Sequence, residues 1–216
     1  MQWPVACAVA IVCMPGLARA QDRSASVGGA VSAFNLDSHT SVAYTASFDF
    51  RFTRVVGLEI EATFVPSLNA PYPGNPVIAN SPIILPFPTI TVANEGGNAT
   101  IWSNNVRVAI PTTAARLEPF FVAGGGVASV KHTADLNVSL PLIIGIPGLP
   151  APAPGARALT LPLSSSSTGL ALTLGGGLGF KATDHLWIDA DLRLIRILGD
   201  QDQNVGRFGV GARYRF

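Results

Sequence analysis

Cysteine is confined to the first twenty residues of this 216-residue chain, at Cys7 and Cys13. The remainder therefore has no disulfide and no thiol chemistry. Charge is also scarce: 12% of the residues are charged, where ordinary globular domains carry about a quarter. The 14 Lys and Arg nearly balance the 13 Asp and Glu. The chain thus lacks the basic surface that nucleic-acid binding requires, and we expect no nucleic-acid partner.

Long apolar runs are missing beyond the N-terminus, although 48% of the residues are hydrophobic. No later run approaches the roughly 20 residues of a membrane helix. The one apolar run, residues 3–14, is followed by a Pro-Gly breaker and by small residues, which predicts a signal peptide over residues 1–20, cleaved after Ala20. The mature chain, 21–216, then forms one domain. Loss of Arg19 leaves it with 13 basic and 13 acidic residues.

Apolar and polar residues alternate strictly in several stretches of the mature chain. Between residues 40 and 52, every even position from Val42 onward is apolar, whereas the odd positions are small, polar or charged. Between 204 and 216, the even positions from Phe208 to Phe216 are apolar, and the odd positions carry glycine and arginine. This period of two predicts strands with one apolar face, because helical spacing cannot produce it.

About eight such strands can be identified, the smallest number that closes a transmembrane barrel. They are expected near residues 24–34, 40–52, 57–64, 99–110, 119–131, 168–180, 186–197 and 204–216. We therefore predict an all-β fold, an eight-stranded antiparallel up-and-down transmembrane β-barrel. Adjacent Phe120 and Phe121 leave open which face of strand 119–131 points inward. Two insertions rich in proline, about 66–98 and 133–167, are predicted to be long external loops, since repeated prolines interrupt a strand ladder. An alternative for their apolar flanking parts, 134–144 and 156–163, is that they extend the barrel strands outward.

Several features together resemble the small outer-membrane β-barrel family, which includes the OmpA and OmpX transmembrane domains and the opacity proteins. These are the signal peptide, the eight strands, the stretch PFFVAGGG from Pro119 and the final RYRF. The resemblance implies the cell outer membrane of a Gram-negative bacterium, with short turns in the periplasm and longer loops outside. It also implies that Tyr214 and Phe216 form a C-terminal signal for the outer-membrane barrel assembly machinery. Further partners are outer-membrane lipid, lipopolysaccharide and an unidentified surface ligand; we expect a monomer.

The strand pattern turns most of the charges into the barrel, where an eight-stranded lumen has room only for side chains. Unpaired charges there are costly, so we predict ion pairs between neighbouring strands. The expected interior network comprises Asp49, Arg51, Glu59, Glu61, Arg107, Asp189, Asp191, Arg193, Arg207, Arg213 and Arg215, with Lys181 also facing inward. We expect Asp189 opposite Arg213, and Arg51 reaching Glu59. Inward glycines at 175, 177 and 179 are expected near Asp191, Asp189 and Trp187 respectively, leaving space for larger side chains.

This pattern favours a non-enzymatic outer-membrane protein with a plugged, charged interior, whose external loops serve surface interaction or envelope integrity. An alternative is a narrow channel for small apolar solutes, because residues 77–92 and 136–163 are strongly apolar for external loops. A second alternative is a lipid-A-modifying hydrolase built on His132, which has Ser129 and Asp135 nearby in sequence. We assign no catalytic, metal-binding or cofactor-binding residue and expect no cofactor.

Overall fold

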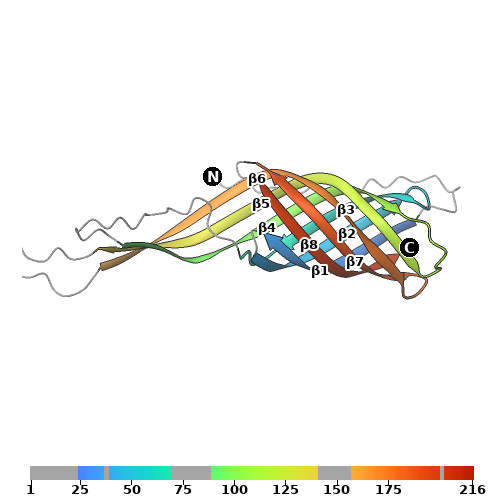
Figure 1. Cartoon of the computed structure of the whole chain (residues 1–216), viewed down its shortest axis with the longest axis horizontal. Helices are drawn as coiled ribbons and strands as arrows, with labels where there is room; N and C mark the ends of the chain where they lie inside the picture. The colour runs from blue at the N-terminus through green and yellow to red at the C-terminus, as the bar shows by residue number, and fades with distance from the viewer. Residues whose placement is uncertain (1–23, 37–38, 70–88, 141–156, 200–201) are drawn as a thin grey trace, which may run out of the picture.

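The fold is a closed ring of eight antiparallel strands (Figure 1). The computed structural model describes residues 24–36, 39–69, 89–140, 157–199 and 202–216, so the predicted signal peptide and its cleavage site lie outside the described residues. The strands are β1 (Ser24–Leu36), β2 (His39–Arg51), β3 (Val56–Val65), β4 (Thr89–Ala109), β5 (Leu117–Leu140), β6 (Arg157–Lys181), β7 (Leu186–Leu198) and β8 (Gln203–Arg215). Each pairs with its sequence neighbour, and β1 pairs with β8. The predicted eight-stranded antiparallel barrel is confirmed. Within the described residues, no helix is long and apolar enough to cross a membrane.

Alternation along the strands separates an apolar outer wall from a filled interior. The large apolar side chains exposed on the wall include Val31, Val42, Tyr44, Phe48, Phe64, Trp102, Leu172, Leu174, Leu194 and Phe208. In β5, Phe120 is 2% exposed and Phe121 is 61% exposed, so the even positions of this strand face inward. This settles the parity that the sequence left open. The wall has one polar exception near its middle, the exposed Asn104.

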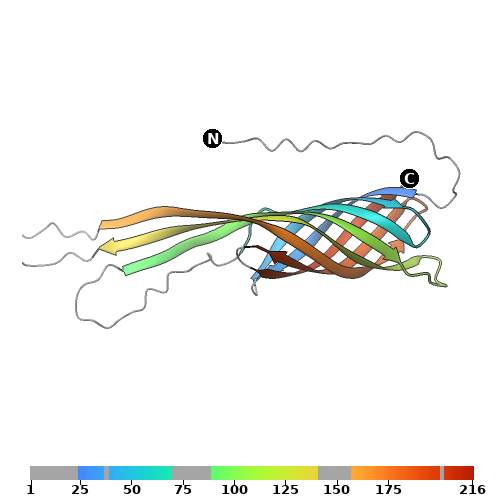
Figure 2. The same cartoon turned by 90° about the horizontal axis from the view of Figure 1, so that it is seen from above.

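Three strands continue far beyond one end of the ring, as Figure 2 shows. β3 pairs with β4 only up to Ala99, and β7 pairs with β6 only up to Leu170, whereas β5 stays paired with both strands almost to its end. We call this three-stranded part, residues 89–98, 131–140 and 157–169, the extension. At about 3.3 Å per residue, the ten residues of β5 within it span roughly 30 Å. The segments predicted as loops, 66–98 and 133–167, are therefore partly strand, and residues 70–88 and 141–156 lie outside the described part.

Beyond a polar row at its base, where His132 and Ser165 face inward, the extension has one polar and one apolar face. Thr133, Asp135, Asn137, Thr160, Ser164 and Ser166 lie on the face that continues the outer wall. Val92, Ala134, Leu136, Leu159, Leu161 and Leu163 lie on the face that continues the lumen. A β-bulge interrupts β4 between Ala93 and Gly96, where Asn94 adopts a φ of 52° and donates a 2.8 Å hydrogen bond to Asp135. The bulge adds one residue to β4, so odd positions of β4 face inward on the barrel side of the bulge. On its far side the even positions face inward, which places Val92 beside Leu136 on the inner face.

Glycine on the inner face of β6 makes room for an aromatic ring of β5. Gly177 lies opposite Phe120, and a Cβ at Gly177 would approach the Phe120 ring to 2.6 Å and collide with the carbonyl oxygen of Ala190. The ring can fold over the strand only because that side chain is missing.

Gly177→Ala is therefore expected to destabilise the barrel by about 1–3 kcal/mol, the typical cost of overpacking. Gly206→Ala is the matched control, since nothing lies within 4 Å of a Cβ built at Gly206; it should be neutral or slightly stabilising. The measurement is the urea midpoint of refolded protein, followed by heat-modifiable gel migration. Equal losses in both variants would contradict the close contact at Gly177.

Candidate functional site

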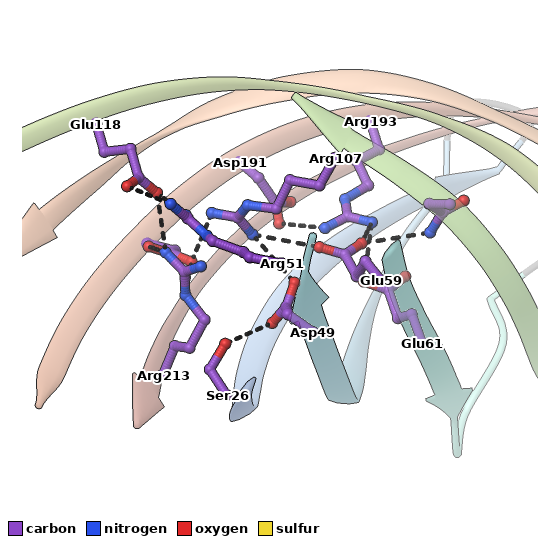
Figure 3. Close-up of polar contacts among 12 residues, drawn as sticks. Ser26, Asp49, Arg51, Glu59, Glu61, Arg107, Glu118, Asp191, Arg193 and Arg213 are labelled. Carbon is purple, nitrogen blue, oxygen red and sulfur yellow. Dashed lines mark hydrogen bonds and ion pairs between the residues drawn. The ribbon is translucent and has the colours of Figure 1, made fainter. Parts of the chain in front are cut away.

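Twelve charged side chains meet inside the half of the barrel nearest the short turns, and Figure 3 shows the part of this group around Arg107. Six are carboxylates and six are arginines, and ion pairs within 4.0 Å join all twelve into one network. They are Asp49, Glu59, Glu61, Glu118, Asp189, Asp191, Arg51, Arg107, Arg193, Arg207, Arg213 and Arg215. We call this network the ionic layer. Its formal charge is zero.

Arg107 occupies the centre of the ionic layer. Asp49 and Glu59 lie directly opposite each other on β2 and β3, so their carboxylates need a cation between them. The Nη1 atom of Arg107 lies 3.2 Å from Glu59 and 3.8 Å from Asp49. Its Nη2 reaches across the lumen to Asp189 at 3.1 Å. The guanidinium also lies 3.5 Å above the centroid of the Phe120 ring, a cation–π contact.

Two further arginines neutralise the carboxylates of β3 from the far side. Arg193 contacts Glu59 at 2.5 Å and Glu61 at 3.0 Å. Arg207 is 1% exposed and donates to Glu61 at 2.7 Å and to the Thr63 hydroxyl at 2.9 Å. Each arginine also reaches Asp191. Each planar guanidinium thus donates several hydrogen bonds to carboxylates, and these contacts offset the free-energy cost of removing its charge from water.

Glu118 completes the network and was not among the residues predicted for it. It pairs with Arg51 and lies 3.6 Å from Arg213 and 3.5 Å from Arg215. The unresolved parity of β5 concealed it, because Glu118 faces inward only if Phe120 does. A signal was nevertheless present, since the expected set held more arginines than carboxylates. Lys181 lies at the rim instead, paired with Asp184 at 2.9 Å.

The structure brings all eleven predicted interior charges together, but in a different register. Gly211, and not Arg213, lies opposite Asp189, although Arg213 still reaches Asp189 at 3.0 Å along the diagonal. The expected contact of Arg51 with Glu59 is wrong, because Gly57 lies opposite Arg51.

The inward glycines of β6 are displaced in the same way. Gly175, Gly177 and Gly179 lie opposite Arg193, Asp191 and Asp189, respectively. In each case the sequence places the centre of the turn one residue away from its position in the structure. This error shifts the strand pairing by two residues, so every side chain still points to the predicted side of the sheet.

Apolar side chains fill the other half of the lumen, at the end that carries the extension. They are Phe34, Leu36, Ala43, Val65, Leu68, Ala99, Ile101, Ala128, Val130, Ala171, Ile195, Ile197 and Val205, which we call the apolar layer. Leu68 enters from the segment after β3, where its N–H donates to the Gly97 carbonyl at 2.8 Å. The Asn69 N–H donates to the Ser41 hydroxyl at 2.9 Å, which holds this segment across the mouth.

Little space remains within the ionic layer. The cavity lined by Glu59, Arg107, Asp189 and their neighbours measures about 30 Å³, room for roughly two water molecules. No group of three or more His, Cys, Asp or Glu among the described residues is arranged to hold a metal ion. The layer is therefore suited to holding the strands together.

The Ser/His/acid set considered for a hydrolase does not assemble. His132 is buried on the inner face of β5, whereas Ser129 is exposed on the outer face. The two residues are three apart on one strand, so alternation places them on opposite sides. The other two histidines lie on other elements, His39 at the start of β2 and His185 in the β6–β7 turn.

The C-terminal aromatic pair lies at the turn end of the wall. Tyr214 and Phe216 are both exposed, and their rings make an edge-to-face contact with centroids 5.3 Å apart. His185 stacks on Tyr214 at 5.7 Å, and the Phe216 N–H donates to Ala25 at 2.9 Å across the β1–β8 seam. Their role as an assembly signal remains a prediction.

Comparison with known proteins gives one family and several similar folds. The model of the outer membrane protein beta-barrel domain matches residues 5–216, and no curated protein matches the chain. A major outer membrane protein from Thermus thermophilus is 13% identical with a TM-score of 0.55, covering 90% of this chain and 99% of that one. Neisserial surface protein A is 12% identical with a TM-score of 0.50, covering 90% and 97%. The attachment invasion locus protein of Yersinia pestis is 18% identical with a TM-score of 0.48, covering 90% and 98%.

Removing one carboxylate from the ionic layer should be costly. Glu59→Gln keeps the shape but leaves Arg193 and Arg107 short of a counter-charge, so a loss of about 3–5 kcal/mol in unfolding free energy is expected. Asp184→Asn is the control: this exposed carboxylate, whose pKa is lowered by its hydrogen bond from Lys181, should be replaceable without measurable effect. Urea titration of the refolded barrel makes the comparison, and similar midpoints for the two variants would contradict a cohesive ionic layer.

Proposed function

Because the chain belongs to the outer membrane protein beta-barrel domain family, we propose that it is a non-enzymatic, plugged barrel that anchors the extension at the surface of a Gram-negative cell. Proteins of this family are integral to the outer membrane, and the exposed apolar wall of β1–β8 is the surface that contacts lipid. The observation that carries the proposal is the filled lumen, which leaves the extension as the part of the described chain free to meet a partner.

Two independent fillings support a plugged interior. The ionic layer has equal numbers of carboxylates and arginines and leaves a cavity of about 30 Å³. The apolar layer then occupies the opposite half, with Phe34, Leu36 and Leu68 each about 1% exposed. An ion or polar solute would have to break paired charges in one half and desolvate in the other. The arrangement therefore favours an anchor over a channel.

The extension is suited to meeting a surface partner through a face, because both of its edges are poor templates for another strand. The β6 edge contains Pro162, which has no N–H to donate. The β4 edge carries the bulge at Asn94 and the charge of Glu95. Such devices prevent edge-to-edge pairing between copies, which supports a monomer. The inner face, with Leu159 and Leu161 about half exposed, is the larger apolar surface outside the barrel.

A plugged barrel should not conduct. Refolded protein in planar bilayers is expected to give no steady single-channel current, with a wide porin as the positive control for the assay. Uptake of small apolar solutes by liposomes that contain the protein should equal uptake by empty liposomes. Steady conductance or faster uptake would overturn the plug and favour the channel alternative.

Surface presentation is testable because the mature chain has no cysteine. Ser164→Cys places a thiol on the exposed polar face of the extension, and Thr113→Cys places one in the exposed β4–β5 turn at the other end. On intact cells, a membrane-impermeant maleimide is expected to label the first variant alone; after permeabilisation it should label both. Labelling of Thr113→Cys on intact cells would show the opposite orientation.

A further inference from the structure

A groove indents the outer wall where β6, β7 and β8 run side by side. It measures about 360 Å³, and its lining is mostly apolar: Leu172, Thr173, Leu174, Leu194, Ile195, Arg196, Asn204, Val205 and Gly206. Thr173, Ile195 and Val205 point into the barrel and are buried, so they contribute the floor. The exposed leucines form the sides. The groove therefore opens toward the lipid and not toward the lumen.

A missing side chain creates the hollow. Leu174, Leu194 and Gly206 lie in one row across the three strands, all facing outward. Nothing lies within 4 Å of a Cβ built at Gly206, in contrast to the inward glycines of the same barrel. Leucine occupies the equivalent position on β6 and on β7, so the gap is local to Gly206.

The next row toward the extension is polar on two of its three strands. It consists of Leu172, Arg196 and Asn204. Arg196 lies ten residues beyond Leu186, the first residue of β7 at the turn end. At about 3.3 Å per residue and a tilt of about 40°, this corresponds to roughly 25 Å, the height of the apolar band of such barrels. Arg196 and Asn204 therefore lie where acyl chains end and headgroups begin.

We propose that this groove binds a lipid A molecule of the outer leaflet, with one acyl chain along Gly206 and a phosphate on Arg196. The inference rests on the proposed orientation, which puts the extension outside. A guanidinium makes strong bidentate contacts with phosphate, and the Asn204 amide can donate a further hydrogen bond to it. An acyl chain in the groove would cover Leu174 and Leu194, which the strand pairing leaves exposed.

Arg196 already has a partner, but one that a lipid phosphate can replace. It contacts Asp202 at 3.1 Å, and both side chains are more than half exposed. An exposed ion pair of this kind contributes little. Asp202 therefore competes with the phosphate for Arg196 and sets the affinity of the groove.

Native mass spectrometry of the purified, folded mature chain in detergent, titrated with bisphosphorylated lipid A, tests the proposal. Arg196→Gln should weaken lipid A binding about tenfold, the effect of losing one charge-assisted hydrogen bond. Gly206→Leu fills the groove and should weaken it similarly. Asp202→Asn should strengthen binding a few-fold because it removes the competing carboxylate. Arg116→Gln, in the exposed turn at the other end, is the matched charge control and should have no effect.

The lipid itself supplies the remaining comparisons. Lipid A without phosphates should bind about as weakly to the wild type as lipid A binds to Arg196→Gln, and phosphatidylglycerol should bind less well than lipid A. Each variant must first show unchanged heat-modifiable migration. Equal lipid A binding by wild type, Arg196→Gln and Gly206→Leu would overturn the site, and preference for phosphatidylglycerol would overturn the choice of lipid. Lipid A binding by purified protein in detergent does not depend on how the barrel is oriented in the cell. A negative result therefore overturns the lipid site alone, whereas the surface-labelling and conductance experiments test the proposed orientation and the plugged lumen.

Discussion

Charge neutrality inside a narrow lumen is the constraint on which this structure depends. Eight strands enclose a space that side chains fill, so a charge placed there has no water to solvate it. The ionic layer meets this constraint with six carboxylates and six arginines that share contacts across the lumen. Arg107, for example, joins Asp49 and Glu59 on neighbouring strands to Asp189 on the opposite wall. The pairs therefore brace walls that backbone hydrogen bonds alone do not connect.

The lumen changes character along its length, and six of the eight strands carry both parts, since β1 and β6 contribute no charge to the ionic layer. On β7, Asp189, Asp191 and Arg193 belong to the ionic layer, and Ile195 and Ile197 belong to the apolar layer. This order puts the interacting charges together at one end of the lumen and apolar side chains at the end near the extension. Leu68, from the segment after β3, joins this apolar layer, and a polar row with His132 and Ser165 separates the layer from the apolar inner face of the extension. The same alternation that builds the membrane wall thus also builds the extension.

The wall itself is not uniform, and its irregularity has a chemical meaning. Most outward positions carry large apolar side chains, but Gly206 leaves a hollow directly below Arg196 and Asn204. The apolar hollow matches the acyl chain of an anionic lipid, and the cation at the membrane boundary matches its phosphate. The proposed functions therefore occupy separate surfaces: the lipid site lies on the wall, and the extension projects beyond it.

The sequence by itself determined the strand number, the barrel class and the face of nearly every charge, because a period of two assigns each residue to a side whatever its partner is. It also placed Arg207 and Arg213 inside with Asp189 and Asp191. Only the tertiary structure decided which charges touch. Turn centres misplaced by one residue moved the pairing by two, so the predicted Arg51–Glu59 contact gave way to Arg51–Glu118 across the lumen. Contacts across a closed ring depend on how all eight strands are staggered, and no local pattern records that stagger.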